Sequence, residues 1–291
     1  MRVAADCFPC FLRQVVIALG HARVEEAMQL KTLKEASQML PSVDTSKTPA
    51  HFTTLLHRRL RQSIGRDPFK DIKSRYNSVA IGLYRELKDS VNSSTDPLNV
   101  AVRLAIAGNI IDFGIFTSID IRGTIDRALN SPLAIDRYDD LVDAIDRAEN
   151  ILYLLDNTGE ALFDRLLIER LTEMGKEITA VVKGENVLND ATIEDAKEVG
   201  LLEVCRVIDN GSDCIGTILD WTSEAFQREF KRYPLIISKG QGNFETLHDY
   251  RGHKTNIFFL FQAKCDALSK MLGLQKGSML LTSSEKDFRD L

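Results

Sequence analysis

The sequence shows no excess of the residues that mark disordered or fibrous chains. It has 291 residues, of which only 17 are Gly and 7 are Pro, while 44% are hydrophobic and 27% are charged. This near-average composition excludes a disordered, collagen-like or low-complexity chain. Since a typical domain has roughly 150 residues, we expect a globular protein with two domains or one large one.

Cysteines are few, and long apolar runs are missing. The five cysteines are an odd number with none between Phe11 and Val204, which argues against the disulfide framework of a secreted protein. No stretch reaches the roughly 18 uninterrupted apolar residues of a membrane-spanning helix. Asp6 and Arg13 interrupt the apolar start that an export signal needs. We therefore expect a cytoplasmic protein without membrane contact.

Basic residues are scarce in the larger part of the chain. Residues 1–100 have 15 Lys and Arg against 10 Asp and Glu, whereas residues 101–291 have 22 against 32. A protein that binds nucleic acid through its phosphates needs clustered Lys and Arg, so this distribution argues against a nucleic-acid partner. An acidic C-terminal part is compatible with binding cations.

The spacing of apolar residues changes near residue 148. Before it, apolar residues recur at helical spacing without alternating β-branched stretches, which predicts a helical domain at residues 1–148. After it, short apolar and β-branched runs alternate with stretches of helical length. The predicted strands are 151–155, 178–182, 203–208, 235–238, 257–261 and 279–282, and the predicted helices are 161–174, 191–199, 215–230 and 266–272.

Strands that alternate with helices are typical of a parallel sheet covered on both faces. The predicted fold class is therefore α/β, with the helical domain followed by a three-layer α/β/α domain at residues 149–291 and a mainly parallel, Rossmann-like sheet. In such sheets, ligands bind beyond the carboxyl ends of the strands. The predicted strand ends are rich in Asp, Asn, Lys and Gly, at residues 156–160, 183–184, 209–213, 239–243 and 264–265.

Asp156 and Asn157 follow the first of these strands. Their oxygens are hard ligands suited to Mg²⁺ or Mn²⁺. Either residue could instead cap the next helix, whose first turn Glu160 would favour. Asp190 presents the same two alternatives one unit later in the chain. Oxygen ligands at two consecutive strand ends favour a divalent metal site.

The segment after the fourth predicted strand is glycine-rich. It consists of Lys239, Gly240, Gln241, Gly242 and Asn243. Its backbone N–H groups and the Lys239 ammonium could face a phosphate, although the segment lacks the Lys-Ser/Thr pair of a Walker A loop. Lys264 is the stronger candidate, because a lysine after so apolar a strand needs an anionic partner; its alternative is a lysine that extends to solvent at the sheet edge.

Several motifs resemble the metal-dependent damage-control phosphatases, a family long catalogued as domain of unknown function 89. They are, in order, Asp156-Asn-Thr-Gly-Glu160, Leu188-Asn-Asp-Ala-Thr192 and Ser238-Lys-Gly-Gln-Gly-Asn-Phe-Glu245. Three further motifs resemble the stand-alone prokaryotic branch of this family. They are Asp6-Cys-Phe-Pro-Cys-Phe-Leu-Arg-Gln14, Asp67-Pro-Phe69 with Lys73 and Asn77, and Gly108-Asn-Ile-Ile-Asp112. The resemblance runs from about residue 6 to residue 265 and implies a helical N-terminal domain beside a three-layer α/β domain.

The resemblance implies which residues bind metal and phosphate. Asp156, Asn157 and Asp190 would hold a divalent cation, for which Mg²⁺, Mn²⁺, Co²⁺ and Ni²⁺ are candidates. The segment 239–243 and Lys264 would bind the phosphate of a small phosphorylated metabolite.

Further residues would complete the substrate site. Glu160 and Asn109 are expected beside the substrate, and Asp112 shares a helix face with Asn109 because the two are three residues apart. Relatives that act on sugar phosphates have an Arg-Thr-x-Lys motif where this sequence reads Phe261-Gln-Ala-Lys264. The lysine is therefore retained, whereas the arginine and threonine are not.

The predicted reaction is hydrolysis of a phosphate monoester by metal-assisted attack of water, with Asp156, Asp190 and Lys264 as the catalytic residues. A rival mechanism makes Asp156 the nucleophile, as in haloacid-dehalogenase phosphatases, but Thr158 stands where those enzymes have a second Asp.

Two other functions compete with phosphate-ester hydrolysis. A methyltransferase that uses S-adenosylmethionine is weakened by the lack of a glycine-rich loop after the first strand, and a non-catalytic metal- and anion-binding regulatory protein is the third possibility.

Cys7 and Cys10 form one C-x₂-C pair, which is half of a zinc site. The remaining thiols, Cys205, Cys214 and Cys265, show no second such spacing. The pair is interpreted as a redox dithiol, as a half-site completed elsewhere, or as helical residues that pack at a domain junction.

Overall fold

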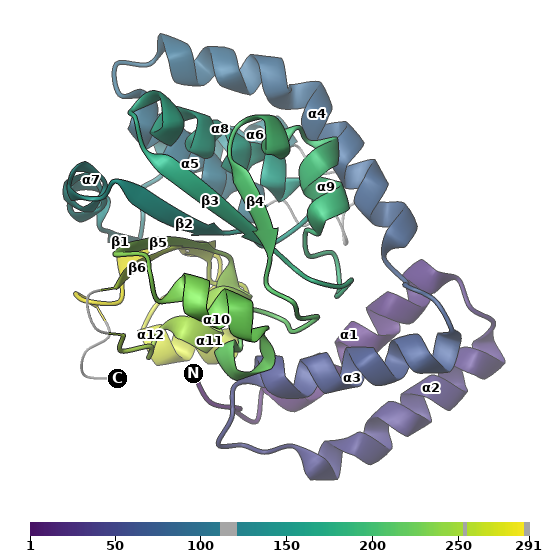
Figure 1. Ribbon diagram of the computed structural model, residues 1–291. Coiled ribbons are helices and arrows are strands. Elements are labelled where there is room, and N and C mark those ends of the chain that lie inside the picture. The colour runs from purple at the N-terminus through teal and green to yellow at the C-terminus, as the bar shows by residue number, and fades with distance from the viewer. Residues whose placement is uncertain (111–120, 253–254, 288–291) are drawn as a thin grey trace.

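The computed structural model describes residues 1–110, 121–252 and 255–287. These residues form one sheet with helices on both sides (Figure 1). The helices are α1 (Cys7–Ala22), α2 (Glu26–Met39), α3 (Pro49–Ile64), α4 (Lys70–Ser93), α5 (Pro97–Ile110), α6 (Ile121–Asn130), α7 (Tyr138–Arg147), α8 (Glu160–Glu173), α9 (Ile193–Glu198), α10 (Glu224–Phe230), α11 (Gln241–Leu247) and α12 (Asp266–Leu272), with short 3₁₀ turns η1 (Leu40–Ser42), η2 (Leu201–Glu203) and η3 (Leu219–Trp221).

The sheet has the strand order β1-β7-β6-β5-β2-β3-β4. The strands are β1 (Ile135–Asp136), β2 (Asn150–Leu154), β3 (Glu177–Val182), β4 (Arg206–Asp209), β5 (Leu235–Lys239), β6 (Asn256–Gln262) and β7 (Met279–Ser283). In the described part of the sheet, β6 and β7 pair antiparallel and the other neighbours pair parallel. The chain runs from β2 through β3 to β4 and resumes at β5 on the opposite side of β2. The crevice between the carboxyl ends of β2 and β5 is therefore the switch point at which open α/β sheets bind ligands.

Alternate residues of the central strands enter two separate apolar cores. Ile151 and Tyr153 of β2 pack with residues of α4–α9, whereas Leu152 and Leu154 pack with residues of α1–α3 and α10–α12. A strand that is buried on both faces requires this period of two. Figure 1 shows α4, α5, α8 and α9 on one side of the sheet and α10–α12 on the other, with α1–α3 next to α11. The three-layer, mainly parallel α/β prediction is confirmed.

The helices of residues 1–148 divide between the two cores. Helices α1–α3 contribute to one core and α5–α7 to the other. Most of α4 packs with α5–α7, but Ile72 in its first turn packs against the core of α1–α3. This segment also contains the strand β1, which pairs with β7 and which the helical pattern did not predict. Two residues are too few to show an alternating pattern. Because both cores contain residues from either side of residue 148, the two-domain boundary there stays a prediction.

Two local predictions differ from the structure after β4 and β5. The helix expected at 215–230 is shortened to α10, because Gly216 has a φ of +65° and the Ser223 side chain caps the helix start by accepting from Phe226 N at 3.1 Å. The segment 239–243 was expected to be an open loop. Instead Gly240 ends the strand with a φ of +81° and helix α11 begins at Gln241.

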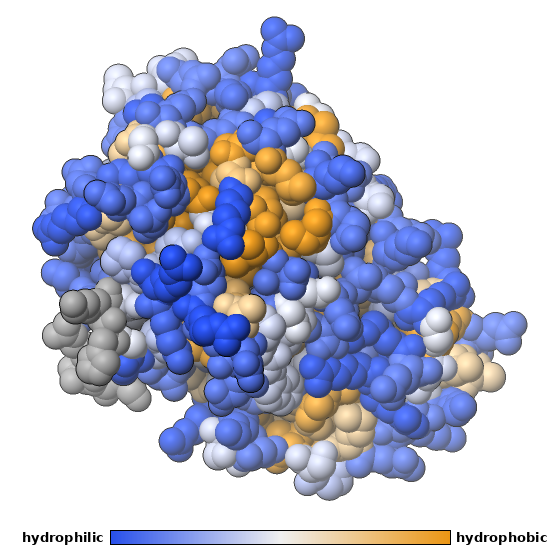
Figure 2. All heavy atoms as spheres, in the orientation of Figure 1, coloured by the Kyte–Doolittle hydropathy of each residue, from blue (hydrophilic) through white to orange (hydrophobic). Residues whose placement is uncertain are grey.

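The surface in Figure 2 is mostly hydrophilic, with an apolar area over β4 and the segment before it. Leu202, in that segment, is 45% exposed. β4 is the edge strand of the sheet, so no further strand covers this side. Across the described ranges, no helix combines the length and the apolar composition that crossing a membrane requires.

Candidate active site

Asp156 lies at the switch point, directly after β2. Its carbonyl oxygen accepts a hydrogen bond from Ala191 N at 2.8 Å, and Thr158 N donates to Asn189 O at 2.8 Å. Asn157 and Asp190 face each other across an isolated antiparallel bridge. The loops after β2 and β3 are thus bound to each other through their backbones, and the three predicted metal ligands lie together.

Two asparagine amides hold one oxygen of the Asp156 carboxylate. Asn157 Nδ2 donates to Asp156 Oδ2 at 2.7 Å, and Asn109 Nδ2, from the end of α5, donates to the same atom at 3.0 Å. Both nitrogens also donate to Glu160 Oε2, at 2.9 and 3.1 Å respectively. Gln262 N donates to Asn109 Oδ1 at 3.2 Å, which fixes the orientation of that amide. Since the Asn157 nitrogen faces two carboxylates, its Oδ1 is the atom that remains for a cation.

Lys239 lies beneath this cluster and is fully buried. Its Nζ donates to Glu160 Oε1 at 2.6 Å, to Asp164 Oδ1 at 2.6 Å and to Ala105 O at 2.8 Å. We expected Lys239 to contact a phosphate, but an ammonium with no exposed surface and three acceptors has no donor left for a ligand. Lys239 is instead the counter-charge that holds Glu160 in place.

Gly240 lets β5 approach the Asp156 carboxylate. A Cβ at residue 240 would lie 1.9 Å from Asp156 Oδ2, and the backbone there has a φ of +81°. Only glycine fits both the conformation and the close contact. Asn243 is also buried, and its Nδ2 donates to Leu155 O at 3.2 Å and to Lys239 O at 2.8 Å. The predicted phosphate segment therefore divides into buried supporting residues, Lys239 and Asn243, and residues that reach a cavity, Gln241 and Gly242.

Lys183, at the end of β3, is a buried lysine beside a predicted metal ligand. Its Nζ lies 3.4 Å from Asp190 Oδ2 and also donates to Gly216 O. Asp190 Oδ2 itself is buried and has no hydrogen-bond partner in the described residues. At 3.4 Å, the Lys183 ammonium pairs with this oxygen by charge without making a short hydrogen bond to it.

Lys264 follows β6 and is half-buried. Its backbone N–H donates to Gln241 Oε1 at 2.8 Å, which ties the end of β6 to the start of α11. Within the described ranges its ammonium makes no hydrogen bond or ion pair, so its charge is not neutralised by a contact. Lys264 and Gln241 line a cavity of about 470 Å³ between α1, α3 and the carboxyl ends of β5 and β6.

The carboxylates at the switch point repel one another. Burial, followed by the charges of Glu160 and Asp190, raises the pKa of Asp156 well above its usual range. Burial also raises the pKa of Asp190, opposed by the charge of Lys183. Burial alone would raise the pKa of Glu160, but the charge and hydrogen bond of Lys239 bring that pKa below its usual range. Burial therefore favours the protonated form of Asp156 and Asp190, in spite of the Lys183 ammonium 3.4 Å from Asp190.

A divalent cation fits this chemistry. Asp156, Asp190 and the Asn157 amide supply hard oxygens, and the buried Asp190 Oδ2 makes no hydrogen bond in the described residues, with the Lys183 ammonium 3.4 Å away. No group of three or more His, Cys, Asp or Glu side chains in the described part of the chain is arranged to hold a metal ion. The predicted set has two carboxylates and one amide, so it needs no such group.

From the sequence we assigned no individual role to several supporting residues, although Lys73 and Asn77 stand in a family motif and Lys183 at a strand end. Asn77 of α4 accepts from Gly159 N at 2.9 Å, which braces the turn after Asp156, and Lys73 pairs with Asp195 at 2.7 Å. Asp164 carries no strand-end or motif signal, although it stands four residues after Glu160 and therefore on the same face of α8. Lys183 had the same sequence signal as Lys264, a lysine directly after an apolar strand.

Two predictions about the first half of the chain have different outcomes. Asp112 lies outside the described residues. Cys7 is buried and Cys10 exposed, and both line the cavity beside Lys264 together with Cys265. Burial raises the pKa of the Cys7 thiol, which disfavours the thiolate that redox chemistry requires.

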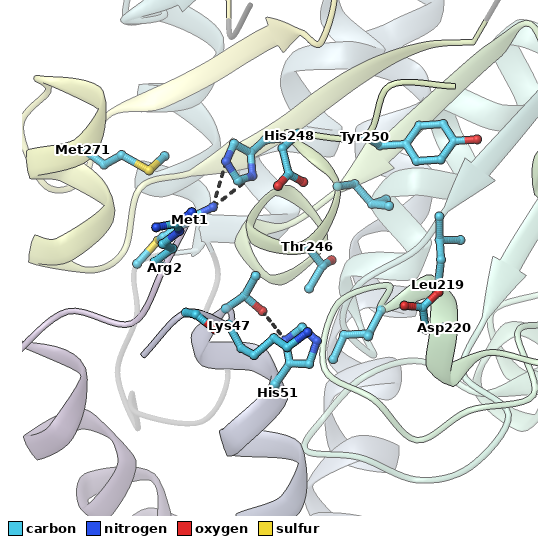
Figure 3. Close-up of a pocket in the computed structure, with 15 residues that line it drawn as sticks. Met1, Arg2, Lys47, His51, Leu219, Asp220, Thr246, His248, Tyr250 and Met271 are labelled. Atoms are coloured by element: carbon cyan, nitrogen blue, oxygen red, sulfur yellow. Dashed lines mark hydrogen bonds between the residues drawn. The ribbon is translucent and has the colours of Figure 1, made fainter. Parts of the chain in front are cut away.

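A second cavity, of about 770 Å³, lies elsewhere (Figure 3). The Met1 amine contacts His248 Nε2 at 2.7 Å on one side of it, and Thr48 Oγ1 contacts His51 Nδ1 at 2.8 Å on the other. None of the candidate site residues lines this cavity. The candidate active site at the switch point is therefore separate from this cavity.

Fold and site define a Rossmann-like α/β protein with a cluster of buried carboxylate and amide oxygens at the switch point of its sheet. The model of the damage-control phosphatase ARMT1-like domain family matches residues 3–280. The chain belongs to this family, and its membership supports a phosphatase role, which is a hydrolase activity.

Archaeal relatives match nearly the whole chain. A damage-control phosphatase of Pyrococcus horikoshii is 33% identical, with 96% of this chain and 97% of the relative covered. A damage-control phosphatase of Archaeoglobus fulgidus is 30% identical over 96% of this chain and 98% of its own. An uncharacterized protein of Methanocaldococcus jannaschii is 37% identical over 97% and 95%.

A solved structure shows the same fold. The crystal structure of a DUF89 family protein from Pyrococcus horikoshii superposes with a TM-score of 0.89 at 33% identity, and the match covers 98% of this chain and 99% of that one. The resemblance read from the motifs is thereby confirmed at the level of the family and the fold.

Proposed function

We propose that this protein is a divalent-metal-dependent phosphatase that hydrolyses phosphate monoesters of small metabolites. The single observation that supports this best is the pairing of opposite charges at the switch point. Asp156 and Asp190 provide buried oxygens that suit a cation, and the neighbouring Lys264 ammonium has no partner in the described ranges. A phosphate that bridges a cation and a lysine would satisfy both.

Asp156, Asn157 and Asp190 would hold the cation, which when bound stabilises charge on the phosphoryl oxygens and makes a water more acidic. Asn109 and Asn157 keep Asp156 Oδ2 occupied, so that Oδ1 is the oxygen directed to the reaction. Lys239 and Glu160 hold those amides in turn. Their role is to position the ligands before substrate arrives.

The chemical step is attack of a water oxygen on phosphorus while the ester P–O bond breaks. Asp190 Oδ2, which has no hydrogen bond among the described residues, orients the attacking water. The Lys264 ammonium stabilises the non-bridging oxygens. The water gives up a proton as its oxygen bonds to phosphorus, and the departing alkoxide oxygen takes up a proton, so that the products are phosphate and the alcohol. The alcohol leaves through the cavity that Gln241 and Lys264 line.

Phosphate release from p-nitrophenyl phosphate, measured with Mg²⁺, Mn²⁺, Co²⁺ and Ni²⁺ in turn, tests this proposal. We expect turnover with at least one cation, and a loss of at least about 100-fold in Asp156→Asn and Asp190→Asn. Asp139→Asn is the matched control, because Asp139 lies exposed in the first turn of α7. Thermal stabilisation by the same cations, lost in the two site variants, reports binding without turnover. If no cation supports turnover, or if both site variants retain full activity, the phosphatase proposal is wrong.

A further inference from the structure

The cavity beside Lys264 has two unpaired cations on its walls. One is Lys264 itself, and the other is Arg13, from the middle of α1. In the ranges that the structure describes, the side chains of both make no hydrogen bond or ion pair. Arg13 is exposed, and its guanidinium offers five donors arranged to bind a carboxylate or a phosphate through two bonds.

The carboxylates of the same cavity are already engaged. Asp6 pairs with Lys270 at 2.7 Å, and Asp266 pairs with Lys276 at 3.3 Å. Glu245 accepts from Gln241 Nε2 at 2.7 Å, and burial raises the pKa of Glu245 to about 7, so that part of the population is neutral at neutral pH. The charge available to a ligand in this cavity is therefore positive.

The place of the cavity connects these cations to the reaction. Gln241 and Gly242 line it, and they follow Gly240, which touches the Asp156 carboxylate. The other wall comes from α1 and α3, with apolar contributions from Phe11 and Ala50. A volume of about 470 Å³ lies within the range of small-molecule sites. A phosphate held near Asp156 would direct the rest of its molecule into this space.

We propose that the cavity is a specificity pocket for phosphate monoesters that have a second anionic group, and that Arg13 binds this second group. The inference rests on the proposed phosphatase function and adds the substrate class to it. Lys264 takes the phosphate that is cleaved, while Arg13, on the opposite wall, takes the carboxylate or second phosphate of the leaving group. A phosphate ester whose leaving group is an uncharged sugar or polyol offers Arg13 no second anionic group to bind.

The test compares two esters of nearly equal size. 3-Phosphoglycerate and glycerol 3-phosphate differ in having a carboxylate or a CH₂OH group at the end of the leaving group. We expect the wild type to favour 3-phosphoglycerate in kcat/KM. Arg13→Gln should lower that preference about tenfold, which corresponds to about 1.4 kcal/mol, and should leave the glycerol 3-phosphate value unchanged. Arg13→Lys should restore part of the preference, because a point charge replaces the two-bonded contact.

Lys31→Gln, on the exposed side of α2, is the matched control for a lost surface cation and should change neither ester. Equal kcat/KM for both esters in the wild type, or an equal loss on both in Arg13→Gln, would overturn the inference. Hydrolysis of p-nitrophenyl phosphate, which has no second anion, separates the two proposals. If that hydrolysis succeeds while the preference is absent, only the pocket assignment fails; if no ester is hydrolysed with any cation, the phosphatase proposal fails and the pocket assignment with it.

Discussion

The buried lysine beneath the candidate site gives the most direct test of what holds the carboxylates of that site in place. Lys239 is 0% exposed and touches two carboxylates, each at 2.6 Å. Lys239→Met keeps the length of the side chain but removes its charge. The substitution leaves Glu160 and Asp164 facing each other in the core without a cation.

Removal of one partner from a buried ion pair costs about 3–5 kcal/mol, because the remaining charge is uncompensated. With about 2–4 °C per kcal/mol for a protein of this size class, we expect Tm to fall by about 10 °C. The exposed pair Arg147–Asp143, with side chains 79% and 67% exposed, is the control. Surface pairs contribute about 0–1 kcal/mol, so Arg147→Met should change Tm by little.

The loss of unfolding free energy in Lys239→Met should depend on pH. Burial, opposed by the charge of Lys239, raises the pKa of Asp164 to about 7. A carboxyl whose folded pKa lies above its unfolded value destabilises the fold once pH exceeds the unfolded pKa, and the cost grows until pH reaches the folded pKa. Without Lys239 the folded pKa rises further, so Lys239→Met should be less destabilised at pH 5 than at pH 8.

Urea unfolding at these two pH values measures the effect, and the double variant Lys239→Met, Asp164→Asn checks its cause. Asparagine keeps an acceptor for the Tyr153 hydroxyl, which donates to Asp164 at 2.8 Å, while it removes one unpaired charge. The double variant should therefore be more stable than Lys239→Met at pH 8. A loss below about 1 kcal/mol, or one of equal size at both pH values, would show that Lys239 is not the counter-charge of this cluster.

Three further outcomes follow from the same geometry. Gly240→Ala should displace the Asp156 carboxylate and lower phosphatase activity by at least about tenfold. Its free energy of unfolding should fall by about 1–2 kcal/mol, which is the backbone strain of a non-glycine residue at a φ of +81°. Activity equal to that of the wild type would contradict the close contact between residue 240 and Asp156. His57 is buried, and burial together with the nearby charge of Arg61 lowers its pKa to about 3. Because the unfolded histidine protonates below about pH 6.5 and the folded one does not, the free energy of unfolding should fall by about 2 kcal/mol as pH drops from 6.5 to 5. Urea unfolding of His57→Leu should lack this fall. Asn77→Ala removes the acceptor of Gly159 N, which braces the turn after Asp156. Calorimetric titration with Mn²⁺ should therefore show a weaker cation affinity at a temperature at which the variant is still folded.

The sequence sufficed to predict the layers and most of the strands because local signals determine them. Buried strands such as β3 and β6 consist mainly of apolar residues, and the polar residues that follow them mark where the sheet meets its crevice. The pairing of β1 with β7 could not be predicted, since a two-residue strand is defined by its neighbour and not by its own pattern. The split of the first 148 residues between two cores is likewise a property of tertiary packing.

The structure brings Asp156, Asn157, Asp190, Glu160 and Asn109 together. The place of the two candidate lysines depends on the face of the sheet from which each side chain projects. Lys239 and Lys264 both follow apolar strands, so the sequence alone did not separate them. In β5, Leu235 and Ile237 face the core that contains α8, and residue 239 has the same parity. Its side chain must therefore point toward α8, where Glu160 and Asp164 stand one turn apart on the inward face. Lys264 lies beyond the end of β6, outside this alternation. Within the described residues its ammonium makes no hydrogen bond or ion pair, so it can bind a ligand.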